Sequence, residues 1–361
     1  MLFSRRNRGP LFLLESRDLT DNRLVLGRFM RIMISAGILV AIFLSVTATA
    51  ARAEQLSLAS VNAAEFSAKT SKRVKLLRKN TKLVLKAQIL LDRAGFSSGV
   101  IDAASGRNFA KALTAFQREN GLTVSGKLDA ATWSKLTATS SAPALIEYEI
   151  TREDVRGPFA EAIPEDWQKK AELKQLAYTS PRELLAEKFH MDEDLLEQLN
   201  PEGAFDQPSV RIVVANVLPA PNGKARADRI QVDKKDWSVR VFDGSGKVIA
   251  FYPASIGNDE KAPSGTHKIT RIVTNPVYVY NPAFGFPGVE ATKKLRIAPG
   301  PNNPVGTVWM NLTLHTYGIH GTAEPHKVGK VHSHGCVRLT NWDARALAAM
   351  VKKGTAVEFL E

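Results

Sequence analysis

The sequence contains a single cysteine among its 361 residues. One cysteine excludes an intrachain disulfide framework and any zinc or iron–sulfur site that needs several cysteine ligands. Charged residues make up 24% of the chain and hydrophobic residues 44%, so the polar bias typical of general disorder is absent. Acidic residues are few, 36 against 49 basic ones, and the net charge of +13 favours an anionic partner such as nucleic acid, a membrane surface or an acidic polymer. The length predicts two or three domains.

Long hydrophobic runs are scarce, and the most apolar one covers Ile32–Val46. Its 15 residues fall short of the roughly 20 that span a bilayer. Arginines precede it, and small residues follow up to the cleavage pattern Ala51-Arg52-Ala53, so we expect residues 1–53 to be a secretory signal peptide. An uncleaved membrane anchor is the alternative. Because Met30 begins a compact signal peptide, residues 1–29 are interpreted as a mis-assigned start.

Cleavage of the expected signal peptide would lower the net charge of the protein. Removal of residues 1–53 takes away eight arginines and three acidic residues, so 41 basic and 33 acidic residues remain and the net charge falls to +8. The sequence carries no motif for reading DNA or RNA. We therefore expect an exported protein that binds no nucleic acid and meets a membrane only through an uncleaved signal sequence.

Residues 54–78 are polar and basic, and we interpret them as a linker to a helical unit at 79–138. Helical spacing of apolar residues predicts helices over Leu83–Ala94 and Arg107–Asn120, and Asp129 is a predicted N-cap of a third.

The order of residues in this helical unit resembles that of a known domain family. It runs Gln88-x-x-Leu91-x-x-x-Gly95-Phe96-x-x-Gly99, then Ala112-x-x-x-Phe116-Gln117-x-x-x-Gly121-Leu122, then Gly126-x-x-Asp129-x-x-Thr132-x-x-x-Leu136. This order resembles the peptidoglycan-binding type-1 domain, except that Asp102-Ala103 stands where the family often has Asp-Gly. The resemblance implies glycan binding, and a spacer without a ligand is the alternative.

Residues 139–225 form a less defined segment. The capping box Ser180-Pro181-Arg182-Glu183 predicts the start of a helix, and Asp192–Leu199 a second one. Together with Tyr178 before them and Val213–Asn216 after them, these elements weakly resemble a LysM module, a βααβ glycan binder. A structural linker domain is the alternative.

Residues 226–361 are rich in β patterns. Short alternating runs at 230–232, 238–242, 248–252 and 266–272 predict strands, as does the alternation of Val308, Met310 and Leu312 with polar neighbours. We expect a last helix over Asn341–Lys353, followed by a strand at 356–360. The predicted fold class is therefore multidomain α+β, with a small helical domain, a linker domain and a β-rich C-terminal domain.

The chemistry-bearing residues surround the cysteine, because five of the seven histidines lie at positions 315 to 334. A free thiol is mostly protonated at pH 7, so a nucleophilic Cys336 needs a base. His320 at a predicted strand end is our candidate, and His334 would orient the loop. Gly335 lets a substrate approach the backbone, where the N–H groups of Gly335 and Cys336 could form an oxyanion hole.

Two other interpretations of this cluster remain open. A lone cysteine in a β-rich domain can be an inert core residue, although the flanking Ser333-His334-Gly335 is not apolar. Alternatively, His320, His332, His334 and Cys336 could ligate zinc, although no established zinc-ligand spacing supports it.

The pattern His320-Gly321-x(11)-Ser333-His334-Gly335-Cys336-Val337-Arg338 closely resembles the signature of YkuD-type L,D-transpeptidases over residues 227–360. This resemblance implies that Cys336 is the nucleophile and His320 the general base and later acid. It gives supporting roles to Ser333, His334, Gly335 and the Gly321 carbonyl. The candidates for substrate binding are Arg338, Tyr317 and Trp309.

The resemblance also implies the reaction. Cys336 would attack the third residue of a peptidoglycan stem peptide, release D-alanine, and pass the acyl group to the amine of a second stem. Water, a lipoprotein lysine or a free D-amino acid are alternative acceptors, and a wall-binding protein with an inert catalytic domain is an alternative of another class. No metal or organic cofactor is implied. The expected location is the periplasm or cell wall of a bacterium.

Overall fold

A computed structural model describes residues 56–67, 81–217, 226–257, 263–284, 289–333 and 335–361. The expected signal peptide, most of the expected linker at 54–78 and His334 lie outside the described residues. Residues 53–361 group into one compact unit. Within the described residues, no helix is long and apolar enough to cross a membrane.

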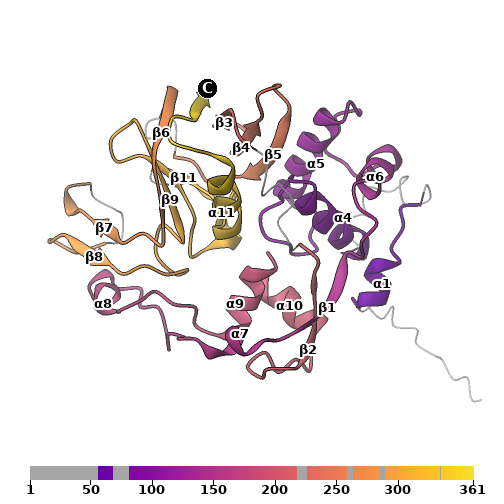
Figure 1. Cartoon of the computed structure of the whole chain (residues 1–361), viewed down its shortest axis with the longest axis horizontal. Helices are drawn as coiled ribbons and strands as arrows, with labels where there is room; N and C mark the ends of the chain where they lie inside the picture. Colours follow the sequence, from indigo (N-terminus) through magenta and orange to yellow (C-terminus); the bar gives the residue numbers. More distant parts are fainter. Residues whose placement is uncertain (1–55, 68–80, 218–225, 258–262, 285–288, 334) are drawn as a thin grey trace, which may run out of the picture. The chain divides into compact units, whose positions relative to one another are not determined.

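The N-terminal helical lobe consists of α4 (Thr81–Arg93), α5 (Arg107–Glu119) and α6 (Ala130–Thr137), shown in violet in Figure 1. The side chain of Asp129 accepts a hydrogen bond from the Thr132 N–H at 2.8 Å and so begins α6 as the sequence predicts. The buried core of the lobe includes Leu90, Phe116 and Trp133. This lobe therefore has an apolar interior of its own.

The middle lobe begins earlier in the chain than the expected boundary at 139. Ser57 forms a capping box that starts α1 (Leu58–Asn62), and the side chain of Asn62 exchanges hydrogen bonds with the backbone of Leu145. Leu56 and Val61 are buried in the middle-lobe core. Part of the expected linker is thus a packed element, because its few apolar residues coincide with a capped helical turn.

Two antiparallel strands, β1 (Leu145–Glu149) and β2 (Arg211–Ala215), close the middle lobe. Between them lie α7 (Arg152–Arg156), α8 (Trp167–Glu172), α9 (Pro181–Lys188) and α10 (Glu193–Leu199). The helices α9 and α10 match the predicted pair. The strand that precedes this helix pair is β1, which lies well before Tyr178 in the chain. Two further helices, α7 and α8, lie between β1 and α9, unlike the βααβ order of the LysM module.

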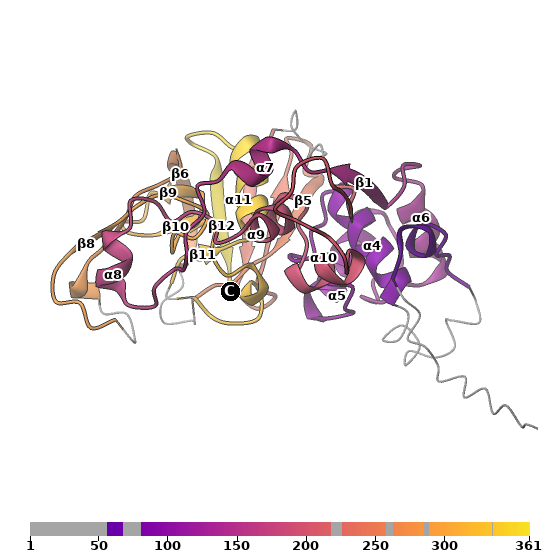
Figure 2. The same cartoon turned by 90° about the horizontal axis from the view of Figure 1, so that it is seen from below.

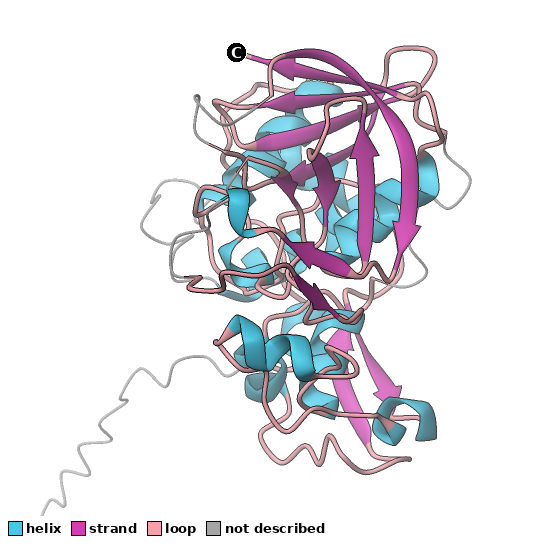
Figure 3. Cartoon of the chain, turned by 90° about the vertical axis from the view of Figure 1, so that its left-hand side faces the viewer, coloured by secondary structure: helices cyan, strands magenta, loops and turns pink. Residues whose placement is uncertain are grey.

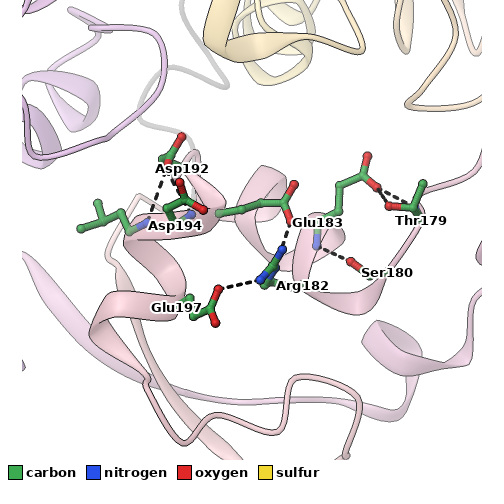
Figure 4. A network of polar contacts seen from close by, with 9 residues as sticks. Thr179, Ser180, Arg182, Glu183, Asp192, Asp194 and Glu197 are labelled. Carbon is green, nitrogen blue, oxygen red and sulfur yellow. Dashed lines mark hydrogen bonds and ion pairs between the residues drawn. The ribbon is translucent and has the colours of Figure 1, made fainter. Parts of the chain in front are cut away.

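A polar network ties α9 to α10 (Figure 4). Ser180 and Asp192 cap the two helices, and Arg182 pairs with Glu193 at 3.0 Å and with Glu197 at 2.6 Å. These ion pairs are well exposed, so the buried leucines of both helices, rather than the charges, supply most of the stability of the pair.

The C-terminal lobe is built on an eight-stranded sheet with the order β11-β10-β9-β6-β12-β3-β4-β5, seen as the curled sheet in Figure 3. In chain order its strands are β3 (Arg229–Asp233), β4 (Ser238–Phe242), β5 (Val248–Pro253), β6 (Gly265–Thr274), β9 (Val308–Leu312), β10 (Gly318–His320), β11 (Val337–Arg338) and β12 (Ala356–Leu360). A hairpin of β7 (Tyr278–Tyr280) and β8 (Leu295–Ile297) stands apart from the sheet. The short 3₁₀ turns η1 (Pro282–Phe284) and η2 (Pro325–Lys327) lie in loops.

Helix α11 (Asn341–Met350) packs Leu347 and Met350 into the core of the sheet, and it ends three residues before the predicted Lys353 (Figure 1). With a helical N-terminal region and a β-rich C-terminal lobe, the predicted multidomain α+β class is confirmed.

The three lobes share polar and apolar contacts. Phe251 on the edge strand β5 exchanges backbone hydrogen bonds with Gly95 and Ser97 of the helical lobe, which covers an otherwise open sheet edge. Glu187 of α9 accepts hydrogen bonds from Asn341 at 2.8 Å and Arg345 at 2.9 Å on α11. Figure 2 shows α8 beside β8, and the ring of Trp167 lies 5.3 Å from that of Tyr280.

Candidate active site

Two short parallel strands bring the ends of the signature motif together. In their register Ile319 of β10 lies opposite Val337 of β11, and His320 lies opposite Arg338. Parallel neighbours need a long crossover, and the 321–336 segment supplies it. Cys336, which directly precedes β11, therefore lies near the start of β10, and a backbone hydrogen bond from Gly318 reaches its thiol.

His320 is buried, with 5% of its surface exposed. Its Nδ1 lies 2.6 Å from the carbonyl oxygen of Gly321. A carbonyl can only accept a hydrogen bond, so we infer that Nδ1 carries the proton and that Nε2 is the free acceptor. Trp309 stacks on the imidazole at a ring distance of 5.3 Å, which holds the ring plane.

The pKa values of the two residues are shifted in opposite directions. Burial, reinforced by the positive charge of Arg338, lowers the pKa of His320 to about 3. Burial raises the pKa of Cys336 to about 11, and the Gly318 N–H and Arg338 offset only part of that rise. At neutral pH the resting site therefore holds a neutral imidazole and a protonated thiol. The Sγ of Cys336 faces the Thr316 carbonyl oxygen at 3.8 Å.

Ser333 braces the turn that carries the cysteine. Its hydroxyl donates to the carbonyl oxygen of Cys336 and accepts from the Gly335 N–H at 3.2 Å, while its own N–H donates to Ile256. Gly335 has a φ of 139°, a conformation that favours glycine. In this resting arrangement the Gly335 N–H is bound to Ser333 and must be released before it can serve an oxyanion.

Arg338 lies half-buried at the same strand pair. Its Nε is buried and has no hydrogen-bond partner among the described residues, and the negative charge of Glu324 acts on its guanidinium. A guanidinium can bind a carboxylate through two N–H groups, so Arg338 stays a candidate for binding a substrate carboxylate. Tyr317 is half-buried in the turn between β9 and β10.

His332 contacts a different set of residues. Its Nδ1 lies 3.3 Å from the carbonyl oxygen of Ile256, and its ring lies edge-on to Trp237 at 4.3 Å. Among the residues that the structure describes, no three His, Cys, Asp or Glu side chains gather as a metal ion would require.

Comparison with known proteins places this geometry in a family. The model of the YkuD L,D-transpeptidase catalytic domain matches residues 227–359, and the model described as "Putative peptidoglycan binding domain" matches residues 80–136. "Putative L,D-transpeptidase YqjB" of Bacillus subtilis is 31% identical over 156 residues, which is 41% of this chain and 81% of that protein. The chain belongs to the L,D-transpeptidase family.

Other relatives of this L,D-transpeptidase family member match over shorter stretches. "Putative L,D-transpeptidase YkuD" of Bacillus licheniformis is 46% identical over 59 residues, 16% of this chain, and the chain covers about a third, 36%, of its length. An L,D-transpeptidase structure from Xylanimonas cellulosilytica shares 15% identity with a TM-score of 0.33, covering 77% of this chain and 92% of that one.

The motif did not point to two further residues near the candidate catalytic residues. Tyr278 of β7 lies close enough to Cys336 that the thiolate's charge, after burial, raises the pKa of the phenol. Asn341 is fully buried: its Oδ1 accepts from the N–H groups of Thr307 and Thr322, and its Nδ2 donates to Glu187 and to the Pro301 carbonyl. The alternation Tyr278-Val279-Tyr280 could have indicated a strand that carries Tyr278. No residue pattern near Asn341 indicates its role.

Asn341 is expected to matter for stability because it fixes the segment after His320. We expect Asn341→Ala to lower the free energy of unfolding by roughly 2–4 kcal/mol, since the buried Thr322 N–H, the partly buried Thr307 N–H and the Glu187 carboxylate lose their partner. Asn120→Ala, which removes one hydrogen bond to Phe116, is the control and should cost less than about 1.5 kcal/mol. Urea unfolding measures both; equal effects would contradict the bracing role of Asn341.

Proposed function

We propose that the chain is a cysteine L,D-transpeptidase that cross-links peptidoglycan stem peptides, with Cys336 as nucleophile and His320 as general base. The main support is the parallel pairing of β10 and β11, which joins the strand that ends in His320 to the strand that Cys336 precedes. The Gly321 carbonyl leaves Nε2 as the proton acceptor, as a general base requires.

The acylation half-reaction follows from the resting protonation states. His320 Nε2 takes the proton of the thiol as the sulfur of Cys336 attacks the carbonyl of the third stem residue, a diamino acid such as meso-diaminopimelate. The bond to the terminal D-alanine then breaks, and the imidazolium returns its proton to the departing amine. A thioester on Cys336 and free D-alanine result.

The transfer half-reaction reverses these roles. The side-chain amine of a second stem attacks the thioester, His320 takes a proton from that amine, and the thiolate of Cys336 leaves and recovers the proton. The product is a cross-link between two third residues. The N–H groups of Cys336 and Gly335 are the proposed oxyanion donors, and Arg338 is the proposed partner of a substrate carboxylate.

Purified protein incubated with disaccharide-tetrapeptide tests this proposal by mass spectrometry. A cross-linked dimer together with released D-alanine is the expected result. A tripeptide without dimer would mean that water is the acceptor, and an exchanged terminal residue would mean that a free D-amino acid is. The absence of any product would contradict the proposal and favour an inert wall-binding protein.

The pH dependence of the reaction tests whether His320 and Cys336 are both uncharged in the resting site. Protonation of His320 removes the base, and since burial lowers its pKa to about 3, kcat/KM should stay level through the range near pH 6.5 where a free imidazole titrates and fall only in strong acid. Stopped-assay rates between neutral and acidic pH measure this. An acidic limb centred near pH 6.5 would indicate a solvated histidine or a resting thiolate–imidazolium pair.

We further propose that the helical lobe tethers the enzyme to peptidoglycan outside the cytoplasm. Binding through a second lobe raises the local concentration of stem peptides without altering the chemistry. Co-sedimentation of the Cys336→Ala protein with purified sacculi tests the tether separately from catalysis.

A further inference from the structure

The peptide unit that joins Gly321 to Thr322 connects the candidate base to helix α11. On one side, the carbonyl oxygen of Gly321 lies 2.6 Å from His320 Nδ1. On the other side, the Thr322 N–H donates to Asn341 Oδ1 at 3.2 Å. A trans peptide unit is planar, and its C=O and N–H point in opposite directions, so a side chain that holds the N–H also fixes the direction of the C=O. Asn341 therefore acts on the hydrogen bond that orients His320.

The amide of Asn341 is held in one orientation. A carboxylate and a carbonyl only accept hydrogen bonds, so Nδ2 faces Glu187 Oε2 at 2.8 Å and the Pro301 carbonyl at 3.1 Å. Oδ1 then faces the N–H groups of Thr307 and Thr322. A turned amide would point Nδ2 at these two donors and Oδ1 at the carboxylate, which is unfavourable on both sides. Glu187 is thus the charged group that decides which end of the amide meets the peptide unit.

The Asn341 amide also has little room to move. It lies against the backbone at Gly306 and Gly321, where a side chain in place of either glycine would collide with Asn341 Oδ1. Asn341 is itself fully buried. Packing therefore sets the position of this amide, and the charge of Glu187 sets its orientation.

Glu187 is fixed in turn by groups from two lobes. It is buried on α9, and its Oε1 accepts hydrogen bonds from the Tyr178 hydroxyl at 2.8 Å and from Arg345 of α11 at 2.9 Å. Position 187 lies outside both regions that match a family model, 80–136 and 227–359. The middle lobe therefore supplies this carboxylate to the catalytic domain.

We propose that Glu187 is a positioning residue for His320 and acts through two amide groups. The imidazole Nδ1–H donates to the Gly321 carbonyl, the N–H of the same peptide unit donates to Asn341 Oδ1, and Asn341 Nδ2 donates to the Glu187 carboxylate. All three bonds donate toward the carboxylate, and hydrogen bonds aligned in this way polarise one another. The role of His320 as base rests on the proposed function, whereas its orientation by Glu187 rests on these hydrogen bonds.

Glu187→Gln tests this series of hydrogen bonds with almost no change in side-chain volume. The introduced amide has one oxygen, which Arg345 and Tyr178 retain, so its N–H₂ group faces Asn341 Nδ2 and the Asn341 amide loses the partner that fixed it. We expect acylation of Cys336 by a carbapenem to slow by about tenfold, since one hydrogen bond of ordinary strength is lost. Mass spectrometry of the intact protein over time measures the rate.

Glu183→Gln is the matched control. Glu183 lies on the same helix, and its Oε1 accepts from Asn302 of the C-terminal lobe at 2.7 Å, so this contact also joins the two lobes. Among the described residues, neither partner hydrogen-bonds to Asn341 or to the 321–322 peptide unit. We expect acylation within about twofold of the wild-type rate. An equal loss in Glu183→Gln and Glu187→Gln would overturn the proposal, because it would reflect weaker contact between the lobes in general.

Exchange of the two functional groups provides a rescue. Asn341→Asp alone brings two carboxylates face to face and should also slow acylation. In the double variant Glu187→Gln/Asn341→Asp, the introduced amide donates to the introduced carboxylate, whose other oxygen accepts from the N–H groups of Thr307 and Thr322. We expect the double variant to be acylated faster than either single variant. A folded double variant that is no faster would overturn the proposal, and if thermal unfolding shows that it does not fold, Glu187→Gln and Glu183→Gln decide.

The hydrogen bond of His320 is measured directly in the same proteins. With ¹⁵N-labelled histidine, the Nδ1–H signal of His320 is recognised by its loss in His320→Gln. Its exchange with water should be faster in Glu187→Gln than in the wild type, and unchanged in Glu183→Gln. An unchanged signal in Glu187→Gln would overturn the positioning role even if acylation slowed.

This signal separates the positioning role from the proposed function, because it needs no reaction. A wild-type protein that no carbapenem acylates, with a His320 signal that responds to Glu187→Gln, would overturn the enzymatic proposal and leave the positioning of His320 standing. Normal acylation with an unchanged His320 signal in every Glu187 variant would overturn the positioning role alone.

Discussion

Replacement of Cys336 by alanine is expected to abolish acyl-enzyme formation and cross-linking. The sulfur is the proposed electron-pair donor of the first step, and alanine has no atom that can take its place. We expect the rate to fall by a factor on the order of 10⁴ or more, as for nucleophile removal in other covalent enzymes. Mass spectrometry of the intact protein after exposure to a carbapenem, which offers a reactive carbonyl, measures acylation directly, and dimer formation from disaccharide-tetrapeptide measures turnover.

The fold should survive this change. Cys336 is only half-buried, so loss of its sulfur leaves a small cavity at most, and the thermal unfolding of the variant should resemble that of the wild type. A carbapenem adduct or a cross-linked dimer that persists in Cys336→Ala would contradict the assignment of the nucleophile. Loss of activity together with loss of folded structure would have to be resolved with Cys336→Ser, which keeps the volume but supplies a poorer nucleophile.

Replacement of His320 by glutamine is expected to lower acylation by about 10²–10⁴-fold, the usual contribution of a general base. The reason lies in the raised pKa of the thiol, about 11, which leaves almost no thiolate at neutral pH unless a base removes the proton during attack. The variant should regain rate as the pH rises toward that value, because hydroxide then forms the thiolate that His320 no longer helps to form. Carbapenem acylation rates between pH 6 and pH 10 measure both effects.

His332→Gln is the matched control for His320→Gln. Both histidines belong to the signature region, but the ring of His332 contacts the Ile256 carbonyl and Trp237. We expect a change of less than about fivefold, as for a residue outside the proton path. An equal loss in the two variants, or no rescue of His320→Gln at high pH, would contradict the role of His320 as base.

Local residue types were enough to predict the family and several secondary-structure elements. The run from His320 to Arg338 identified the family, and the caps at Asp129 and Ser180 and the alternation from Val308 to Leu312 predicted their elements, since capping and periodicity act over a few residues. The roles of the individual site residues remain predictions that the variants above test.

Other features could not be predicted from the sequence, because they depend on contacts with residues far away in the chain. The α1 helix at Leu58–Asn62 looked like linker, since its contacts to Leu145 come from residues 83 positions away. Asn341 gave no local signal, because its four partners belong to three separate segments of the chain.

The sequence by itself determined the family: a cysteine and a histidine in the L,D-transpeptidase order, in a basic chain whose helical lobe matches the model of a putative peptidoglycan binding domain. The tertiary structure decided how these two residues are brought together and in which direction their pKa values shift. Parallel pairing of β10 and β11 joins two strands whose candidate catalytic residues are sixteen positions apart in sequence, and burial then raises the pKa of Cys336 and lowers that of His320. Desolvation depends on every element packed around a group, so neighbouring residues in the sequence indicate candidate reactive side chains but not the protonation states in which they begin.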